Sequence, residues 1–420
     1  MSDSNGAKHR VVVLGAGYAG THVAGTLARR LSPGSVEITV VNAEPDFVQR
    51  LRLHQLAAGR EIEAPALADV FAGTGIRLRQ ARVTAVDPGR RTVSVTDARG
   101  GGEVGYDTLV YALGSRGADH GVPGVREHAF DVAARPSALR LRERLDGLEA
   151  RGGGGRVVVV GDGATGIETA CEIAESRPGL SVTLVARGAL GAPLSPGARA
   201  HLRRACGRLG VAVVEDAEAV AVTADRVVCA DGTGLPSDAT VWAAGFAVLP
   251  IAADAGVEVA GDGRIVVDRT MRSVSHPDLY AVGDSAHALM DNGLALPMSC
   301  ASAGYTGRQA TAAIVARLTG RRVRHTGLEY VGNHIGLGRH DGILQKVGRD
   351  ARAVPGYVGG RKAARVKAGI LWMSLWATRH PTFGLPARRR RPARAGRGGA
   401  DGAGTAAGAT AGAGAGSRVS

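Results

Sequence analysis

Two sets of three glycines carry the clearest chemical signal in the sequence. Each set has the spacing G-x-G-x-x-G and directly follows a run of apolar residues, at 11–14 and at 157–160. In such a turn the first glycine allows the sharp bend, the second lets the backbone approach a pyrophosphate, and the third lets helix and strand pack closely. The spacing predicts two sites that bind the pyrophosphate of a dinucleotide at a helix N-terminus. The glycines are Gly15, Gly17 and Gly20 in the first set, and Gly161, Gly163 and Gly166 in the second.

A glycine-rich turn without a ligand is the alternative interpretation of one such set, and the repetition argues against it. Residues 156–166 copy residues 10–20 almost position by position. Two dinucleotides held face to face suit the transfer of a hydride between a nicotinamide and a flavin. The remaining residues of the two turns that we expect to contact a cofactor are Ala16, Tyr18, Ala19, Ala164 and Thr165.

The end of the second strand of each unit normally carries an acid that binds the ribose hydroxyls. In the first unit Asn42 stands there, and its amide can still form a hydrogen bond with a hydroxyl. In the second unit Ala186 stands there, followed by Arg187. Because Arg187 could bind a 2′-phosphate, the sequence slightly favours NADPH. The alternative is a solvent-exposed Arg187 and a site that binds NADH without the acid.

Three further apolar strands are predicted to end at the ligand-binding edge of a sheet. Two of them, at 106–111 and 240–243, lead to Gly114 and Gly245. A third, at 279–282, ends in Gly283 and Asp284, which places a carboxylate at the carboxyl edge where ligands bind in such folds.

The cysteines argue against thiol–disulfide chemistry. No cysteine precedes Cys171, and the four cysteines form no C-x-x-C pair. A disulfide framework, a zinc site and a dithiol redox centre are therefore not expected. The basic stretch at 50–55 contains Arg50, Arg52, His54 and Gln55. These side chains could line the pocket of the flavin or of the acceptor, or they could belong to an ordinary surface loop and helix.

With these features together, the sequence resembles the flavoprotein superfamily of pyridine nucleotide oxidoreductases with two dinucleotide-binding domains, and within it the type II NADH dehydrogenases. The resemblance covers roughly residues 10–318. It implies FAD on the first glycine set, with Asp284 accepting from the ribityl chain, and NADH or NADPH on the second. It also implies that Glu168 positions the nicotinamide or assists proton movement, against the alternative of a helix first-turn acid. Val83, Ala112, Cys300 and Ala301 complete the residues predicted to contact the cofactors.

The resemblance gives an α/β fold class with two Rossmann-like dinucleotide-binding domains and a small C-terminal region. The FAD-binding domain takes residues 8–117 and 261–325, and the NAD(P)H-binding domain, 118–260, is inserted into it. Residues 326–385 form the C-terminal region. Residues 386–420 are a basic Gly/Ala-rich segment that we expect to be disordered.

The C-terminal region and the net charge indicate which surfaces or molecules the protein could bind. Residues 361–379 read as a helix with basic residues at its start and Trp372 and Trp376 further on, which suits a helix at a membrane surface. The alternative is a helix packed on the protein or on a second subunit. The charge of +14 comes partly from the tail, where a solvated basic segment is favoured over specific nucleic-acid binding. Histidine and acidic residues, including His334 and Asp341, gather at 334–341. We expect this segment to be a glycine-rich turn rather than a metal site.

The acceptor of the electrons is the open question. Type II dehydrogenases carry paired glutamines beside the quinone, and these are absent from the stretch at 297–306. The prediction of a quinone acceptor therefore depends on the C-terminal helix, which resembles a membrane-surface helix. A small ferredoxin-type redox protein is the second choice, and a non-catalytic flavoprotein that binds NAD(P)H and changes partners is the third. The sequence has no signal peptide and no run of about 18 apolar residues, so we expect a cytoplasmic protein, peripheral on the inner face of the cell membrane. A homodimer is left open.

Overall fold

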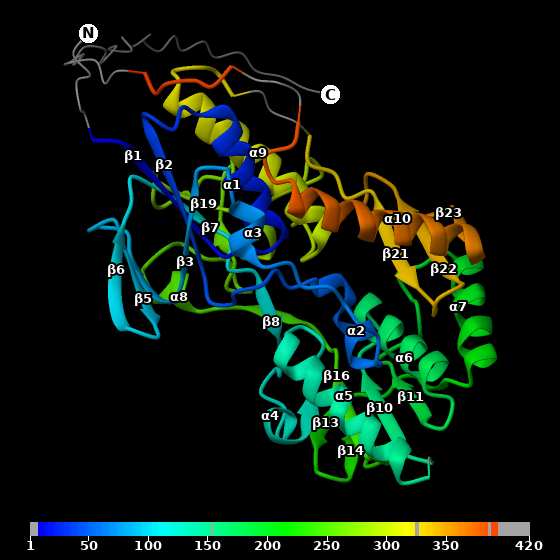
Figure 1. Cartoon of the computed structure of the whole chain (residues 1–420). Coiled ribbons are helices and arrows are strands. Elements are labelled where there is room, and N and C mark those ends of the chain that lie inside the picture. The colour runs from blue at the N-terminus through cyan, green and yellow to red at the C-terminus, as the bar shows by residue number, and fades with distance from the viewer. Residues whose placement is uncertain (1–6, 153, 324–326, 385–387, 394–420) are drawn as a thin grey trace, which may run out of the picture.

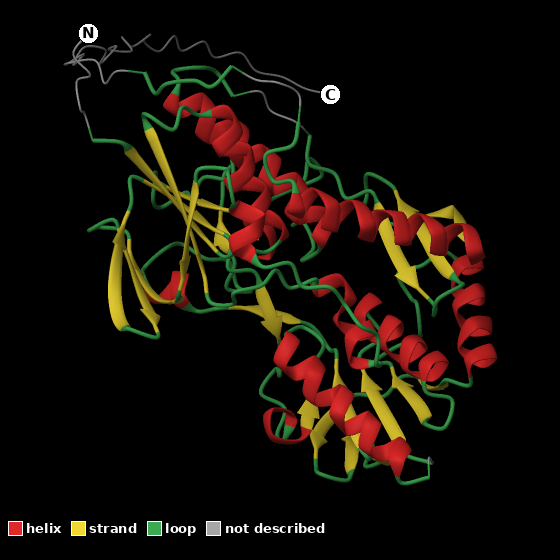
Figure 2. Cartoon of the chain, viewed as in Figure 1, coloured by secondary structure: helices red, strands yellow, loops and turns green. Residues whose placement is uncertain are grey.

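The computed structural model describes residues 7–152, 154–323, 327–384 and 388–393. Two parallel sheets dominate it (Figures 1 and 2). The first has the order β19-β7-β1-β2-β3, and the second the order β12-β11-β10-β16-β9. Each contains one of the two apolar runs that precede a glycine set, so the predicted α/β class is confirmed.

The first sheet is built around β1 (His9–Leu14), whose last four residues are buried. Parallel neighbours pair with it on both sides, and packing against both faces of the sheet leaves residues 11–14 at most 2% exposed, which explains the unbroken run of apolar residues. The neighbours are β2 (Val36–Asn42) and β7 (Thr108–Tyr111), with β3 (Ile76–Gln80) and β19 (Leu279–Ala281) at the edges. The helices α1 (Tyr18–Arg30) and α9 (Cys300–Leu318) pack against each other beside it, and α3 (Leu67–Phe71) contacts β3.

The second sheet repeats this arrangement around β10 (Arg156–Val160). Its partners are β11 (Ser181–Val185) and β16 (Ala239–Trp242), with β12 (Ala212–Val214) and β9 (Ala129–Phe130) outside them. The helices of this half are α5 (Arg135–Ala150), α6 (Ala164–Ser176) and α7 (Pro196–Leu209). The chain enters this half at β8 (Ser115–Gly117) and leaves it at β17 (Phe246–Val248), and these two strands pair with each other.

Small sheets and short helices complete the two halves. The first half carries a hairpin of β4 (Arg82–Asp87) and β5 (Thr92–Asp97), extended by β6 (Gly100–Gly105). The second half carries β13 (Ala219–Val222), β14 (Arg226–Cys229) and β15 (Gly234–Pro236). The other elements are η1 (Arg50–Arg52), α2 (Leu53–Ala57), α4 (Val125–His128), α8 (Ile251–Asp254), β18 (Ile265–Val266), η2 (Gly283–Ser285) and β20 (Ala286–His287).

The C-terminal part is a sheet and a long helix. The sheet contains β21 (Gly332–Gly336), β22 (Gly342–Val347) and β23 (Ala353–Gly359), all antiparallel. The helix α10 (Gly360–Arg379) runs from this sheet to α1, as Figure 1 shows. It occupies the span at 361–379 that the sequence predicted to be helical.

Part of the segment expected to be disordered has a defined position. Arg390 forms backbone hydrogen bonds with Arg30 and Ser32, and the Ala393 amide donates to the carbonyl of Leu318. Residues 388–393 therefore lie along the ends of α1 and α9, and the predicted tail has to start later than residue 386. Residues 394–420 lie outside the described residues.

Candidate functional site

The two glycine turns have the same backbone geometry. Gly15 and Gly161 have φ angles of +94° and +112°, which residues other than glycine rarely adopt. A Cβ atom at Gly20 would overlap the carbonyl oxygen of Gly15, and one at Gly166 would overlap that of Gly161. Each helix must therefore carry a glycine at this point to pack on its strand.

The middle glycine of each turn faces open space. A Cβ at Gly17 or Gly163 would meet nothing within 4 Å, so the backbone is accessible from that side. The first helical bonds run from Thr21 to Gly17 and from Ile167 to Gly163, which leaves the preceding amide groups without partners inside the helix. The residues present at both turns therefore fit a pyrophosphate.

The ends of β2 and β11 differ. The Asn42 Oδ1 atom accepts a hydrogen bond from the amide of Ala16 at 2.9 Å, and its Nδ2 atom donates to the carbonyl of Glu44 at 2.8 Å. Asn42 thus holds the first glycine turn in addition to standing at the predicted ribose position. Ala186 is completely buried and offers only a methyl group, while Arg187 is exposed.

Asp284 lies where the ends of β7 and β19 meet. The Ser115 hydroxyl donates a hydrogen bond to its Oδ2 atom at 2.6 Å, and the Arg50 guanidinium lies 3.6 Å from the same oxygen. Gly283, with φ of +65°, donates its amide to the Thr306 hydroxyl of α9 at 2.9 Å. The predicted carboxylate is therefore fixed between both strand ends and the second helix of the first half.

The N-terminus of α9 is close to this carboxylate. Ser299 caps the helix by accepting a hydrogen bond from the amide of Ser302 at 3.1 Å. Cys300 is half-buried and Ala301 is exposed in the first turn of the helix. Burial raises the pKa of the Cys300 thiol to about 11, so it stays protonated at neutral pH. The thiol is therefore a packing group rather than a nucleophile.

Glu168 lies in a buried cluster that joins three parts of the chain. Its Oε1 atom accepts from the amide of Gly336 at 2.8 Å and from the Lys367 ammonium of α10. The imidazole Nδ1 atom of His54, from α2, lies 4.0 Å from Oε2. The second glycine unit, the C-terminal helix and the segment after β2 therefore meet at one carboxylate.

Burial controls the protonation of this cluster. It lowers the pKa of Lys367 from 10.5 to about 7, so the ammonium can lose its proton near neutral pH. It also lowers the pKa of His54 to about 3, with a smaller contribution from the Lys367 charge, so the imidazole is neutral at physiological pH. Lys367 is thus the group of the cluster that can hold or release a proton in the neutral range.

Sequence reasoning missed Lys367 as the partner of Glu168. It placed Lys367 among the basic residues of a surface helix, and no local pattern links two residues that lie 199 positions apart. The half-buried environment of Lys367 depends on β21 and α6, which only the fold brings to α10.

The other predicted residues fall into two groups. Ala112 lies against the first glycine turn, and Gly245, with φ of +131°, accepts from the amide of Ala118 after β8. Ala164 and Thr165 form the first turn of α6. Val83 is different, because it pairs with Val95 in the β4–β5 hairpin and its side chain is buried in the first core.

The residues at 334–341 do not gather into a metal site. Asp341 accepts a hydrogen bond from His201 at 2.8 Å and also binds Arg208, both on α7. Within the described ranges, the chain has no group of three or more His, Cys, Asp or Glu side chains that could hold a metal ion. Asp341 instead fastens the C-terminal sheet to the second half.

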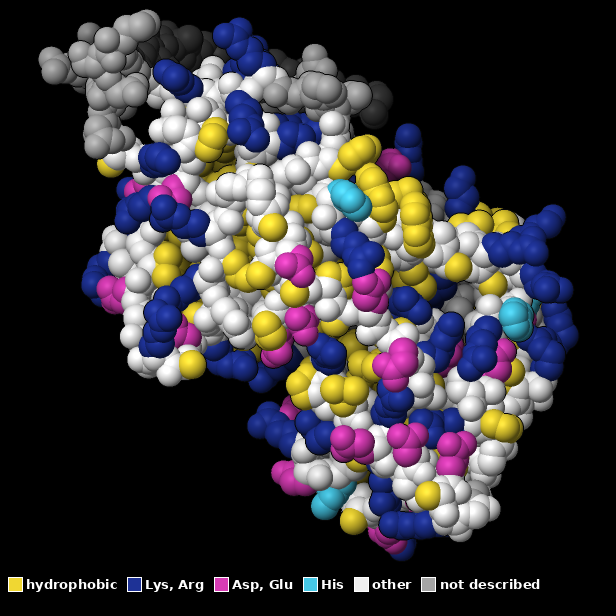
Figure 3. Space-filling model, in the orientation of Figure 1, with side chains coloured by type: hydrophobic (Ala, Val, Ile, Leu, Met, Phe, Trp, Pro, Cys, Tyr) yellow, Lys and Arg dark blue, Asp and Glu magenta, His cyan; other side chains and the backbone are white. Residues whose placement is uncertain are grey.

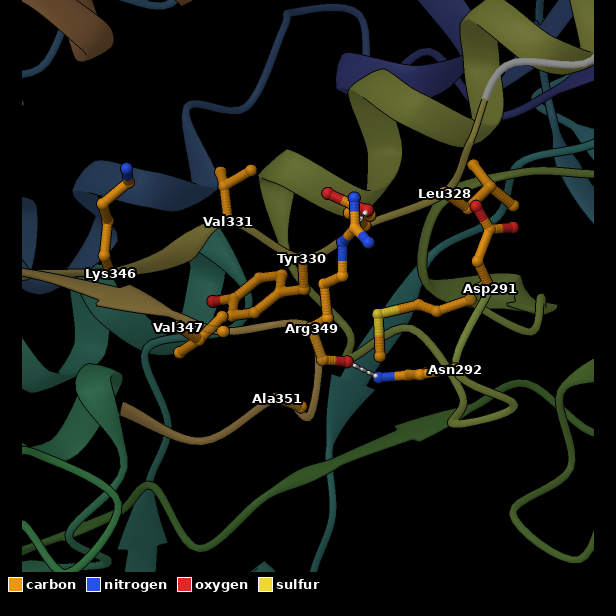
Figure 4. Close-up of a pocket in the computed structure, with 12 residues that line it drawn as sticks. Asp291, Asn292, Leu328, Tyr330, Val331, Lys346, Val347, Arg349 and Ala351 are labelled. Atoms are coloured by element: carbon orange, nitrogen blue, oxygen red, sulfur yellow. Dashed lines mark hydrogen bonds and ion pairs between the residues drawn. The ribbon is translucent and has the colours of Figure 1, made fainter. Parts of the chain in front are cut away.

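A cavity of 640 Å³ lies next to the C-terminal sheet, apart from the residues above (Figure 4). The Asn292 side chain closes one side by donating to the carbonyl of Arg349 at 2.6 Å. Its charges are balanced, since Arg349 faces Glu329 and Asp291 faces Arg269. None of the residues predicted to contact a cofactor lines it.

The outer face of α10 is apolar. Val366, Ile370 and Met373 are spaced one helical turn apart and are 49%, 37% and 52% exposed, and Trp372 beside them is 62% exposed. Figure 3 shows hydrophobic side chains along this helix with Lys and Arg side chains around them. Among the helices of the described residues, none has the length and hydropathy that crossing a bilayer requires.

Two glycine turns on two parallel sheets, with a carboxylate at the edge of the first, define an oxidoreductase with two dinucleotide-binding units. The chain belongs to the pyridine nucleotide-disulphide oxidoreductase family, whose model matches residues 9–314. Although the family name refers to disulphides, the described part of this chain has no cysteine before Cys171 and all its cysteines are free.

Related proteins agree with this assignment. The chain is 34% identical over 326 residues to an NADH dehydrogenase-like protein of Mycobacterium tuberculosis, which covers 72% of this chain and 78% of the relative. It is 26% identical over 400 residues to a type II NADH:quinone oxidoreductase of Staphylococcus haemolyticus, covering 86% and 94%. The NDH2 of Plasmodium falciparum, solved with NADH, shares the fold with a TM-score of 0.75 at 14% identity and covers 90% of this chain and 97% of its own.

Proposed function

We propose that this protein is an FAD-dependent NAD(P)H dehydrogenase that passes electrons to a quinone-type acceptor. The observation that carries the proposal is the contact of Glu168 with Lys367. It joins the helix of the second glycine turn to a helix with an exposed apolar face. A proton-holding group therefore lies between the nucleotide-binding unit and the surface that suits an apolar acceptor.

The residues of the chain have distinct roles in this reaction. Gly15, Gly17 and Gly20 would hold the FAD pyrophosphate, with Asp284 binding the ribityl chain. Bound FAD would take a hydride from the nicotinamide and pass on electrons, chemistry that no side chain here supplies. The second glycine turn binds and orients NAD(P)H so that its reactive carbon is aligned for transfer.

Lys367 and Glu168 supply the proton chemistry. Reduction of a quinone to a quinol by NAD(P)H takes up the hydride and one further proton, and burial leaves Lys367 with a pKa of about 7. The Lys367 ammonium can therefore donate a proton at neutral pH, and Glu168 holds it in place. The Gly336 amide donates to the same carboxylate oxygen, Oε1, and the neutral His54 imidazole lies 4.0 Å from Oε2.

The surface of α10 supports contact with a membrane. The apolar stripe of Val366, Ile370 and Met373 follows the basic residues Arg361 and Lys362 at the start of the helix. Basic groups attract anionic headgroups, and the apolar side chains can enter the interface. Such a position would bring the protein to its quinone.

The first experiment is stopped-flow reduction of the flavin absorbance by NADH and by NADPH, followed by reoxidation with a soluble quinone. We expect fast reduction and fast reoxidation. Lys367→Met is expected to slow reoxidation by at least tenfold and to leave reduction by NAD(P)H within about twofold, because one proton-transfer group contributes about 10²–10⁴-fold to a rate. Lys362→Met, an exposed lysine of the same helix, is the matched control.

The outcomes separate the alternatives. Fast reduction with reoxidation only by a small acidic redox protein would replace the quinone by the acceptor that the net charge of +14 suits. A flavin that is reduced once and then stays reduced with every acceptor would indicate a non-catalytic nucleotide-binding protein. A purified protein without flavin would contradict the proposed function altogether.

A further inference from the structure

Arg50 lies at the centre of the residues assigned to the flavin. Its guanidinium is 3.6 Å from the Asp284 carboxylate and donates to the Ser115 hydroxyl at 3.2 Å, while that hydroxyl donates to the same carboxylate at 2.6 Å. The three side chains form a closed triangle at the end of β7. Only Asp284 of the three carries negative charge, so the Arg50 cation neutralises it.

Two further features hold Arg50 in this position. The ring of Phe246, on β17, lies 5.7 Å from the guanidinium carbon, at the distance of a cation–π contact. A Cβ atom at Gly114, where φ is +68°, would lie 3.4 Å from the Arg50 Nη1 atom. The bare backbone at Gly114 therefore leaves room for the guanidinium, which is 29% exposed.

The charge of Arg50 matters for the chemistry of the site. A hydride that reaches a flavin brings two electrons, and the reduced ring carries negative charge more readily than the oxidised ring. An unpaired carboxylate beside it would oppose the reduction, and a paired one would not. With Arg50 at 3.6 Å, the Asp284 carboxylate can bind the ribityl chain without imposing this cost.

We propose that Arg50 is a positioning residue that neutralises Asp284 and thereby raises the reduction potential of the bound flavin. This inference rests on the proposed function, because it requires that the first glycine unit binds FAD. It assigns the basic stretch after β2 a role in tuning the flavin rather than in binding the acceptor.

The test is a spectroelectrochemical titration of the flavin in the purified holoprotein. We expect Arg50→Ala to lower the ratio of reduced to oxidised flavin at a fixed potential by about tenfold, which corresponds to about 30 mV for a two-electron couple. Arg50→Lys should recover most of the ratio, because the charge is restored. Asp284→Asn combined with Arg50→Ala should also recover it, because no carboxylate then remains to be neutralised.

Arg142→Ala is the matched control. Arg142 is also 29% exposed and also binds one acid, Glu61 at 2.8 Å, but it lies on α5. Its replacement should leave the potential unchanged. If folded Arg50→Ala loses its flavin, the titration is made on Arg50→Gln, for which we expect the same tenfold fall in the ratio because the positive charge is absent.

Two results would overturn the inference. One is an Arg50→Ala protein with the wild-type potential, and the other is an Arg50→Lys protein shifted as far as Arg50→Ala. Both leave the proposed function intact as long as the wild-type flavin is reduced by NAD(P)H. Failure of the proposed function is recognised separately, by a wild-type protein that holds no flavin.

Discussion

The two strand–glycine turn–helix units share one backbone arrangement but contact different side chains. Their turns agree in the positive φ of the first glycine and in the close approach at the third, at Gly20 and Gly166. They differ two residues after the third glycine, where the first unit has His22 and the second has Glu168. His22 lies against Gly307 of α9, and its buried Nε2 atom has no hydrogen-bond partner among the residues that the structure describes. Glu168 binds Lys367 and the Gly336 amide.

With the proposed function, this difference separates the part of the unit that binds a dinucleotide from the part that takes part in proton transfer. The turn has a similar backbone in both units, with a positive φ at Gly15 and at Gly161, because the glycine spacing is the same. The residue two positions after the third glycine differs between the units, and in the second unit this residue, Glu168, contacts Lys367 of α10. The chain therefore obtains two binding sites from one pattern and one proton-holding site from the departure.

The largest expected effect separates the two turns. Gly166→Ala introduces a Cβ that overlaps the Gly161 carbonyl, so we expect the protein to keep its flavin but to be reduced by NAD(P)H about 100-fold more slowly, in line with the cost of a few kcal/mol for overpacking. Gly20→Ala should instead lose the flavin. Flavin content and reduction rate measure the two effects, and Gly147→Ala, in open space on α5, is the control. Equal loss of flavin in both variants would contradict the assignment of the units.

The second effect concerns pH and the charge of the second unit. The Lys367 ammonium is present below its pKa of about 7 and is lost above it. We therefore expect reoxidation by quinone to fall about tenfold per pH unit above pH 7, and Lys367→Met to abolish this dependence. The rate of flavin reduction by NAD(P)H should not fall in this pH range. A reoxidation rate that stays constant from pH 7 to pH 9 would exclude Lys367 as the proton donor.

The third effect concerns the first unit. Asn42→Ala removes the hydrogen bonds to the Ala16 amide and the Glu44 carbonyl, which hold the glycine turn. We expect the affinity for FAD to fall by up to about 30-fold, since two bonds are lost and each contributes about 1 kcal/mol. Fluorescence titration of released flavin measures it, with the NAD(P)H affinity as the internal control. An unchanged FAD affinity would mean that the glycine turn keeps its conformation without the Asn42 side chain.

The smallest expected effect concerns nucleotide choice. Arg187→Ala should weaken the use of NADPH by about twofold to fivefold and leave that of NADH nearly unchanged, because an exposed charge pair contributes about 1 kcal/mol or less. The ratio of kcat/KM for the two nucleotides measures this. Equal losses for both would show that Arg187 does not bind a 2′-phosphate.

Local patterns predicted the parts of the fold that local sequence controls. The glycine spacing and the apolar runs give β1, β10 and the helices after them, and these positions agree with the structure. The pairing of Lys367 with Glu168 and of Arg50 with Asp284 could not be predicted in this way. Both depend on contacts between segments far apart in the sequence, 199 residues in the first case, and on burial that the whole fold creates.

The pairing of β8 with β17 has a consequence for how the second half can be exchanged. Paired strands lie about 5 Å apart, so the chain leaves the first half and returns to it at almost the same point. Closely spaced ends alone would allow this insertion to be exchanged without moving the rest of the chain. It is not an autonomous module, however, because its core includes Leu53 and Leu56 from α2 and Ile335 and Ile343 from the C-terminal sheet. Excised on its own, the second half would expose the apolar surface that α2 and the C-terminal sheet cover in the complete chain.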